Sequence, residues 1–206
     1  MSELLPMFPL GTVLFPGVAL PLHVFEPRYR ALTRDCLDGD RRFGVVLIER
    51  GSEVGGGDVR TSVGTCARIV EATELPDGRW VLIALGSERV SVERWLADDP
   101  YPRAEVNVLT DAPAGPDTAE QRAEVERLLR KALALKAELG EPAPPATFEL
   151  DPDPAVAAYQ AAALSPLGPL DCQRVLEQEG PDQRLAVLAV ALTDEVAVLA
   201  QRASWG

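Results

Sequence analysis

The first 110 residues alternate short apolar runs with turn-forming residues, a pattern typical of a β-rich chain. Prolines interrupt the runs at 4–10 and 18–25, and because proline removes a ladder donor, these runs are typical of edge strands and bends. The triplet Pro-Asp-Gly at 76–78 predicts a tight turn. The predicted strands are 4–10, 18–25, 43–49, 63–75, 79–86, 88–96 and 104–109. Short strands joined by tight turns indicate a small barrel or a bent sandwich.

One helix is predicted between these strands, at residues 27–38. Pro27 suits the first helical position, where its missing N–H costs nothing. Tyr29, Leu32 and Cys36 then recur at helical spacing and form an apolar stripe. The helix is expected to end near Gly39.

The pattern becomes helical after a linker-like segment at 111–118. Asp117 and Glu120 have the spacing of a capping box, so a helix is predicted from there to Gly140. Its apolar stripe is Val125, Leu128, Ala132, Leu135 and Leu139.

Three more helices are predicted after a proline-rich connection at 141–154. They cover 155–164, 171–179 and the segment from Pro181 onward. The apolar stripe of the last helix is Leu185, Leu188, Leu192, Val196 and Leu199. Four striped helices make a bundle. We therefore expect an α+β protein with a β domain at 1–112 and a helical domain at 113–206.

Composition and charge narrow the class of protein. Hydrophobic residues make up 47% of the 206 positions and charged residues 25%, which permits a packed core. A net charge of −12 repels nucleic-acid phosphates and anionic lipid, so neither nucleic acid nor membrane is expected as a partner. The three scattered cysteines favour free thiols in a reducing compartment. Because the sequence has neither a signal-peptide pattern nor a long apolar run, we expect a cytoplasmic protein.

The lone histidine, His23, is the first candidate for catalysis. A single histidine with three distant cysteines does not provide a zinc ligand set, so no metal is expected. A serine triad would need His23, but no G-x-S-x-G elbow accompanies it. A Cys36–His23 pair is conceivable. We favour a histidine that fills the barrel wall and a core cysteine, because Cys36 falls on the apolar stripe of its helix.

Three other candidates have structural interpretations that we favour. Glu26 is either a general acid or, as we prefer, a helix cap or a partner of a neighbouring arginine. The glycine-rich segment 51–57 lacks the lysine and the following helix of a phosphate loop, so it indicates a flexible hairpin loop. Lys131 and Lys136 lie on a long helix, where an activated amine is not expected. No cofactor is expected.

Several segments of the first half resemble the N-terminal, substrate-binding domain of Lon proteases, in the peptidase S16 family. They are LPMFPLGTVLFPGVALPLHVFEPRYRAL (5–32), FGVVLIERGSEVGG (43–56), VGTCARIVEATELPDGRWVLIALGSERVSV (63–92) and DDPYPRAEVNVL (98–109). Residues 117–203 are similar, more loosely, to the helical companion of that domain. The resemblance implies a PUA-like β pseudo-barrel with one inserted helix, followed by a C-terminal α-helical bundle. In this family PLHVFEPRYR is the strand-to-helix corner, so the stretch around His23 is interpreted as a folding signature.

In Lon proteases this domain recognises and delivers unfolded or tagged polypeptides and helps oligomerisation. The present sequence has no G-x-x-x-x-G-K-[ST] motif for ATP, and it ends at Trp205–Gly206 without room for a Ser–Lys protease domain. We therefore expect a stand-alone bacterial Lon-domain protein that is not an enzyme. Its expected partners are unfolded or partly folded polypeptides or a partner protein, with a link to protein quality control or proteolysis. Homo-oligomerisation also fits the resemblance.

Exposed apolar side chains are the expected contacts for a bound peptide. The candidate peptide-binding residues are Phe15, Leu22, Phe25, Tyr29, Trp80 and Trp95. Most of them are expected to lie in the core, and packing of the barrel is the favoured role of the two tryptophans. Two alternatives stay open. PUA relatives bind RNA, although the acidity of this chain disfavours that function, and an uncharacterised hydrolase would depend on His23.

Overall fold

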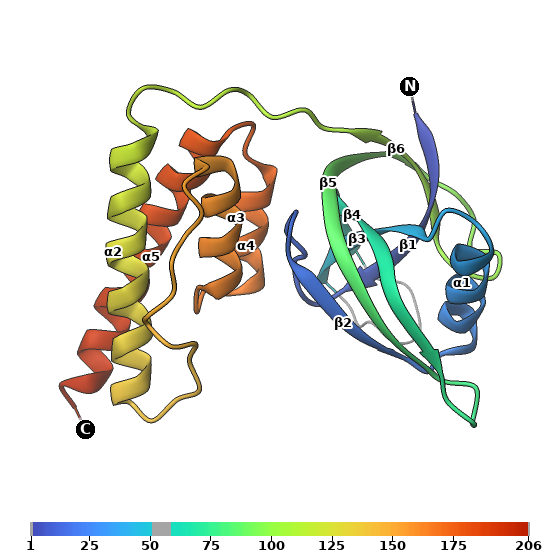
Figure 1. Ribbon diagram of the computed structural model, residues 1–206, viewed down its shortest axis with the longest axis horizontal. Helices are drawn as coiled ribbons and strands as arrows, with labels where there is room; N and C mark the ends of the chain where they lie inside the picture. Colours follow the sequence, from blue (N-terminus) through green and yellow to red (C-terminus); the bar gives the residue numbers. More distant parts are fainter. Residues whose placement is uncertain (1, 51–58, 206) are drawn as a thin grey trace. The chain divides into compact units, whose positions relative to one another are not determined.

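The computed structural model describes residues 2–50 and 59–205. The chain forms two compact units, residues 1–110 and 111–206, here called the β unit and the helical unit. The predicted mixed α+β composition is confirmed by the strands of the first unit and the helices of the second (Figure 1). That each unit is an independent domain, with limits at 1–112 and 113–206, stays a prediction. No helix in the described part of the chain is long and apolar enough to cross a membrane.

The β unit contains six described strands in one sheet. They are β1 (Glu3–Leu10), β2 (Ala19–Val24), β3 (Arg42–Arg50), β4 (Val59–Glu74), β5 (Trp80–Trp95) and β6 (Arg103–Val108). The strands pair in the order β2-β5-β4-β3-β1-β6, and β6 also pairs with β5. Five strands therefore close into a ring, and β2 pairs with β5 outside it. Only the β1–β3 pairing is parallel among these pairings.

The long strand β5 makes this closure possible. Its first half, from Trp80, pairs with β2, and its second half, from Val90, pairs with β6. The prediction of two separate strands at 79–86 and 88–96 is therefore wrong. Gly86 looked like a turn residue in the sequence. In the structure it lies inside the strand, where an added Cβ would overlap with the carbonyl oxygen of Phe15.

The helix α1 (Pro27–Asp38) begins and ends where the pattern predicts. Its striped residues Tyr29, Leu32 and Cys36 are buried in the larger of two apolar clusters of the β unit. The Tyr29 ring stacks on Phe8 of β1 with ring centroids 4.0 Å apart. The core of the ring thus extends under α1.

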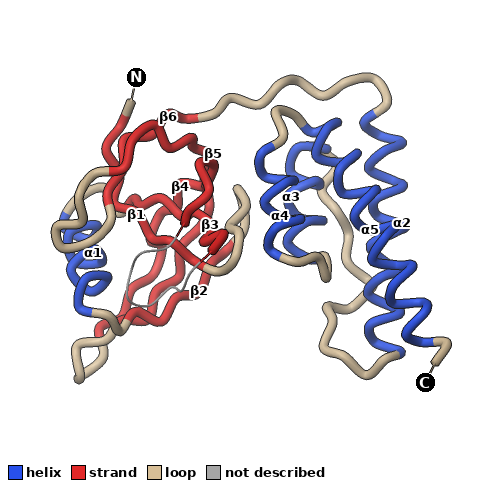
Figure 2. The backbone as a smooth tube through the Cα atoms, turned by 180° about the vertical axis from the view of Figure 1, so that it is seen from behind, coloured by secondary structure: helices blue, strands red, loops and turns tan. Residues whose placement is uncertain are grey.

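The helical unit contains α2 (Thr118–Glu138), α3 (Pro154–Leu164), α4 (Pro169–Glu177) and α5 (Pro181–Ala203). The helices α2 and α5 lie side by side (Figure 2). Asp182 at the start of α5 accepts hydrogen bonds from Gly115 and Thr118 at the start of α2, and Arg202 pairs with Glu141 beyond the other end. The two long helices are therefore parallel. This arrangement requires the long connection between them.

Two sequence predictions for α2 need correction. Asp117 occupies the cap position, but its side chain makes no capping hydrogen bond, so the capping box with Glu120 is wrong. Asp182, which is distant in sequence, supplies the carboxylate instead. The predicted stripe also missed Leu129 and Leu133, which are buried, whereas Leu135 and Leu139 are only half-buried.

The proline-rich connection at 141–153 contains no helix or strand and returns along α2. Arg130 donates a hydrogen bond to the carbonyl oxygen of Phe148 at 2.9 Å. Arg122 donates to the carbonyl oxygen of Asp151 at 3.3 Å. These arginines on α2 donate to carbonyl oxygens of the returning segment that lie outside any helix or strand.

Candidate functional site

A small pocket at the β2–α1 corner brings together three of the six predicted peptide-binding residues. It has a volume of about 190 Å³. Its lining residues are Phe8, Leu10, Pro21, Leu22, His23, Val24, Phe25, Glu26 and Tyr29. Phe8, Leu10, Val24 and Tyr29 are buried, whereas Pro21, His23 and Phe25 are exposed. The pocket therefore combines a buried, mostly apolar floor with an exposed rim.

The corner folds in this way because a strand is followed directly by a proline-started helix. Val24 ends β2, and Pro27 begins α1 after only two intervening residues. The Glu26 carboxylate makes no cap hydrogen bond and instead pairs with Arg28 at 3.1 Å. The Arg28 guanidinium also lies 4.5 Å from the centre of the Tyr29 ring. Of the two structural roles predicted for Glu26, the arginine pairing is confirmed and the cap is wrong.

The other three predicted residues do not line this pocket. Phe15 is 2% exposed and belongs to the interior. Trp80 is half-buried and packs against the larger core cluster. Trp95 is half-buried, packs against the smaller cluster, and lies 4.5 Å from the guanidinium of Arg60.

His23 is exposed on the rim, so the prediction that it fills the barrel wall is wrong. Strand alternation explains its position, because Val24 takes the buried face of β2 and His23 takes the opposite one. Its imidazole makes no hydrogen bond with any other residue in the described ranges, so it is not joined to a serine, a cysteine or a carboxylate.

Cys36 lies in the core, as its stripe position predicts. Its thiol donates to the carbonyl oxygen of Arg42 at 3.2 Å, and burial raises its pKa to about 12. A thiol in this state does not supply the thiolate that nucleophilic chemistry requires. The conceivable Cys36–His23 pair therefore does not form.

The remaining chemical candidates give no constellation either. Lys131 is exposed on α2, and Lys136 lies 3.7 Å from Glu141. The glycine-rich segment 51–57 lies outside the described residues. Within the described residues, no group of three or more histidine, cysteine or acidic side chains is arranged to hold a metal ion.

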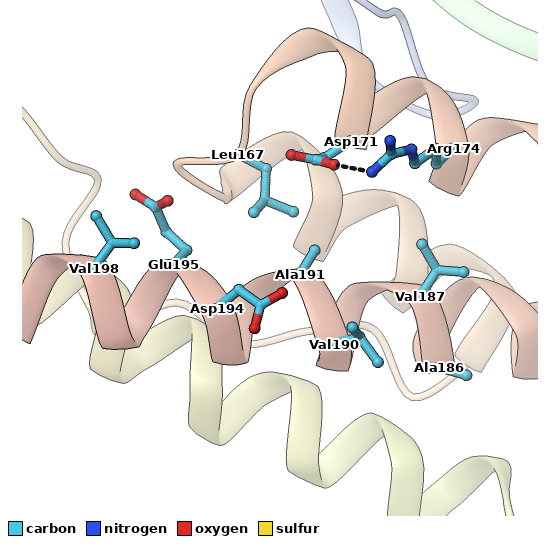
Figure 3. Close-up of a pocket in the computed structure, with 10 residues that line it drawn as sticks. All are labelled: Leu167, Asp171, Arg174, Ala186, Val187, Val190, Ala191, Asp194, Glu195 and Val198. Carbon is cyan, nitrogen blue, oxygen red and sulfur yellow. Dashed lines mark hydrogen bonds and ion pairs between the residues drawn. The ribbon is translucent and has the colours of Figure 1, made fainter.

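A larger groove lies in the helical unit, between α5 and α4 with the loop before α4 (Figure 3). Its volume is about 520 Å³. The lining residues are Leu167, Asp171, Arg174, Ala186, Val187, Val190, Ala191, Asp194, Glu195 and Val198. The sequence analysis missed this groove. Its signal was present as a second apolar stripe on α5, at Val187, Val190, Ala191 and Val198.

Comparisons with known proteins identify the relatives of this chain. The family described as the ATP-dependent protease La (LON) substrate-binding domain matches residues 4–194. Lon protease 2 of Herpetosiphon aurantiacus is 32% identical over 205 residues, which cover 95% of this chain and 24% of that protein. The Lon protease of Cytophaga hutchinsonii is 36% identical over 131 residues, or 62% of this chain and 16% of that protein. The chain thus spans about a quarter or less of these relatives.

Solved structures agree with the sequence comparisons. The Lon N-terminal domain protein from Xanthomonas campestris is 30% identical, covers 91% of this chain and 98% of its own, and superimposes with a TM-score of 0.67. The N-terminal domain of the Mycobacterium avium complex Lon protease has the same fold, with a TM-score of 0.68 at 19% identity and coverage of 93% of this chain. The match of the family to nearly all of the sequence, together with these structures, shows that the chain belongs to the Lon substrate-binding domain family.

Proposed function

We propose that this chain is a non-catalytic substrate-recognition module that binds apolar side chains of unfolded or partly folded polypeptides. The pocket at the β2–α1 corner is the proposed site, with Leu22, Phe25 and Tyr29 as contact residues. Phe25 carries the proposal, because it is 55% exposed at the rim of a pocket with a buried apolar floor. An aromatic ring left in water next to such a pocket gains free energy by contacting a further apolar group.

The size of the pocket suits one side chain. A dry apolar cavity of about 150 Å³ holds benzene, and this pocket has about 190 Å³. Burying one large apolar side chain contributes about 1.5–3 kcal/mol, which is less than the ~4 kcal/mol of millimolar affinity. A bound chain would therefore need further contacts beside the pocket. Such binding is weak at each point and tolerant of sequence, as recognition of unfolded chains requires.

The strand β2 offers the further contact surface. Among the described strands it pairs with β5 alone, and its exposed residues Pro21 and His23 also line the pocket. An extended polypeptide can add to an open strand edge through backbone hydrogen bonds while a side chain enters a neighbouring pocket. Pro21 has no N–H to donate, which limits this pairing to a few residues.

The proposal also includes the predicted fold type of each unit and the predicted cellular role. We interpret the closed ring with α1 as a PUA-like pseudo-barrel and the helical unit as the companion bundle of the family. The family match covers a substrate-binding domain and no catalytic domain, which supports a role without catalysis, in the cytoplasm, linked to protein quality control or proteolysis. Three free thiols agree with a reducing compartment.

Titration calorimetry with a reduced and alkylated polypeptide that cannot fold tests the proposal. Phe25→Ser should weaken binding by about tenfold, or ~1.4 kcal/mol, without loss of stability because the ring is exposed. Leu4→Ser is the matched control, since Leu4 is 53% exposed in the same unit but does not line the pocket. The wild type must bind, and only the Phe25 variant should bind more weakly. Equal losses in both variants, or no binding by the wild type, would contradict the proposal.

The absence of catalysis is tested separately. Purified protein should not turn over ATP, a peptide or a small ester. Turnover that disappears in His23→Ala or Cys36→Ala would show that this chain is an enzyme after all.

A further inference from the structure

The α4–α5 groove is an unpartnered apolar surface on a helix that already has one buried stripe. The buried stripe of α5 is Leu185, Leu188, Leu192, Val196 and Leu199. The groove stripe follows helical spacing on another face, and its members Val190 and Val198 are 65% and 52% exposed. A helix that is apolar on two faces is typical of one with neighbours on both. The unit's own helices cover the first stripe and leave much of the second in water.

We infer that this groove docks an amphipathic helix of a partner protein, whose apolar stripe is flanked by lysine or arginine. The surface belongs to the helical unit, and the inference does not depend on the pocket of the β unit. Three properties of the groove define the occupant: its length and backbone, its charge, and its relation to a second copy of the chain.

The shape of the groove favours a helical occupant. From Val187 to Val198 the floor extends over twelve residues of α5, or about 16 Å and three turns at 1.5 Å per residue. The floor is formed by helices whose backbone groups are bonded within the helix, so it offers few partners to an extended chain. An extended segment would bury unpaired N–H and C=O groups there, whereas a helix satisfies its own. Ala186 and Ala191 leave room for close approach between helix backbones (Figure 3).

The charge of the groove favours a basic occupant. Arg174 is already paired with Asp171 at 2.8 Å. The side-chain carboxylates of Asp194 and Glu195 have no hydrogen-bond or ion-pair partner in the described part of the chain. The groove therefore offers two unpaired carboxylates beside an apolar floor. Lysine or arginine side chains on both sides of an apolar stripe would meet them, which gives orientation and specificity.

The same charges exclude a second copy as the favoured occupant. A twofold dimer through this face would place the same patch on both sides of the interface, so the unpaired Asp194 and Glu195 carboxylates of both copies would gather in one interface. The chain also carries a net charge of −12, so two copies repel each other. A basic partner helix removes both penalties.

Fluorescence anisotropy with a labelled synthetic helix tests the inference on the intact chain. The probe is an amphipathic peptide of about 18 residues, or five turns, with leucines at i, i+3, i+4 and i+7 flanked by lysines. Val190→Asp should weaken its binding at least tenfold. Val156→Asp, on α3 and 37% exposed outside the groove, is the matched control and should bind like the wild type. The exposure of both positions keeps these variants folded.

Two further comparisons distinguish the effects of charge and helicity from non-specific hydrophobic binding. A peptide with glutamates in place of the lysines should bind at least tenfold more weakly to the wild type, and the double variant Asp194→Lys, Glu195→Lys should reverse this preference. A peptide with a central proline, which breaks the helix, should lose binding. The inference is overturned if the lysine peptide does not bind at about 1 mM, if Val190→Asp does not weaken its binding, or if the proline peptide binds equally well. A wild-type dimer that Val190→Asp dissociates would also overturn it in favour of a second copy.

Discussion

The β unit and the helical unit of this chain fix their structures by different means. In the β unit, strands distant in sequence approach so closely that some positions accept no side chain. An added Cβ on Gly64 would overlap with the carbonyl oxygen of Val45. In the helical unit, apolar stripes bring the helices together, and buried polar side chains determine which segments meet. The comparison teaches that apolar patterns decide which elements form, whereas single glycines and buried polar groups decide how these elements are joined.

Arg184 is the main polar connection of the helical unit. Its side chain is fully buried and forms two hydrogen bonds with Asp111, where the chain enters the unit. It also donates to the carbonyl oxygen of Gln178 at 3.0 Å and lies 4.5 Å from the centre of the Tyr159 ring on α3. One guanidinium on α5 thus contacts Asp111 in the linker, the carbonyl oxygen of Gln178 at the end of α4, and the Tyr159 ring on α3.

The largest expected effect follows from removing this connection. Arg184→Ala should destabilise the helical unit by about 3 kcal/mol, the lower end of the usual cost of breaking a buried ion pair, because the remaining Asp111 carboxylate is partly exposed. The variant leaves Asp111 without its cation and Gln178 without its donor. Urea unfolding followed by far-UV circular dichroism at the helix band measures the change.

The same experiment tests the comparison between the units. In a Trp205→Phe background, which removes the tryptophan of the helical unit, fluorescence of Trp80 and Trp95 reports on the β unit and should keep its unfolding midpoint in Arg184→Ala. A shift of equal size in both signals would show that the two units unfold as one. Asp111→Asn leaves the fully buried Arg184 guanidinium without a counter-ion and should destabilise the helical unit by a similar amount.

The second effect concerns the β unit and is expected to be smaller. Gly64→Ala should cost about 1–3 kcal/mol, because the new methyl group forces β3 and β4 apart. Gly168 is the control, since an added Cβ there meets nothing within 4 Å. Gly168→Ala should therefore stay within about 0.5 kcal/mol of the wild type. If Gly64→Ala were equally neutral, close backbone approach would not be what fixes the β unit.

Elements with a strong local signal could be predicted from the sequence. The limits of α1 follow from Pro27 and Gly39, and all five residues of the predicted α5 stripe are buried. The continuity of β5 was missed at Gly86, which packs against the carbonyl oxygen of Phe15. In the sequence, such a glycine cannot be distinguished from a glycine in a tight turn. The Asp182 cap and the Arg184 connection were missed for the same reason, since their partners lie more than 60 residues away.

The candidate site residues show the same difference between local and distant determinants. Leu22, Phe25 and Tyr29 share a pocket because a single strand-to-helix corner places them, and the sequence indicates that corner. Trp80 and Trp95 belong to β5 and pack against the core clusters, so the favoured prediction that they pack the barrel is confirmed and their candidacy as pocket residues is not. The α4–α5 groove was missed because the α5 stripe was taken to be its only apolar face.

The smallest expected effect is a pH dependence at Asp182. The Thr118 hydroxyl and the Gly115 N–H both donate to its carboxylate and hold its pKa below the ordinary 3.8. The ionised form is therefore favoured in the folded state. Its contribution to stability is fully present above pH 3.8 and is lost as the pH falls through the lowered pKa of the folded protein.

Asp182→Asn should accordingly lower the Tm of the helical unit near neutral pH, and its Tm should approach that of the wild type in acid. Thermal unfolding followed by circular dichroism between neutral pH and pH 3 measures the difference. Asp194→Asn on the same helix is the control and should match the wild type throughout, because the Asp194 carboxylate makes no hydrogen bond or ion pair with another described residue. A Tm difference for Asp182→Asn that stayed constant down to acid pH would mean that the side chain joins the two helix starts by shape alone. The helical unit would then depend on close fit at this point, as the β unit does at Gly64.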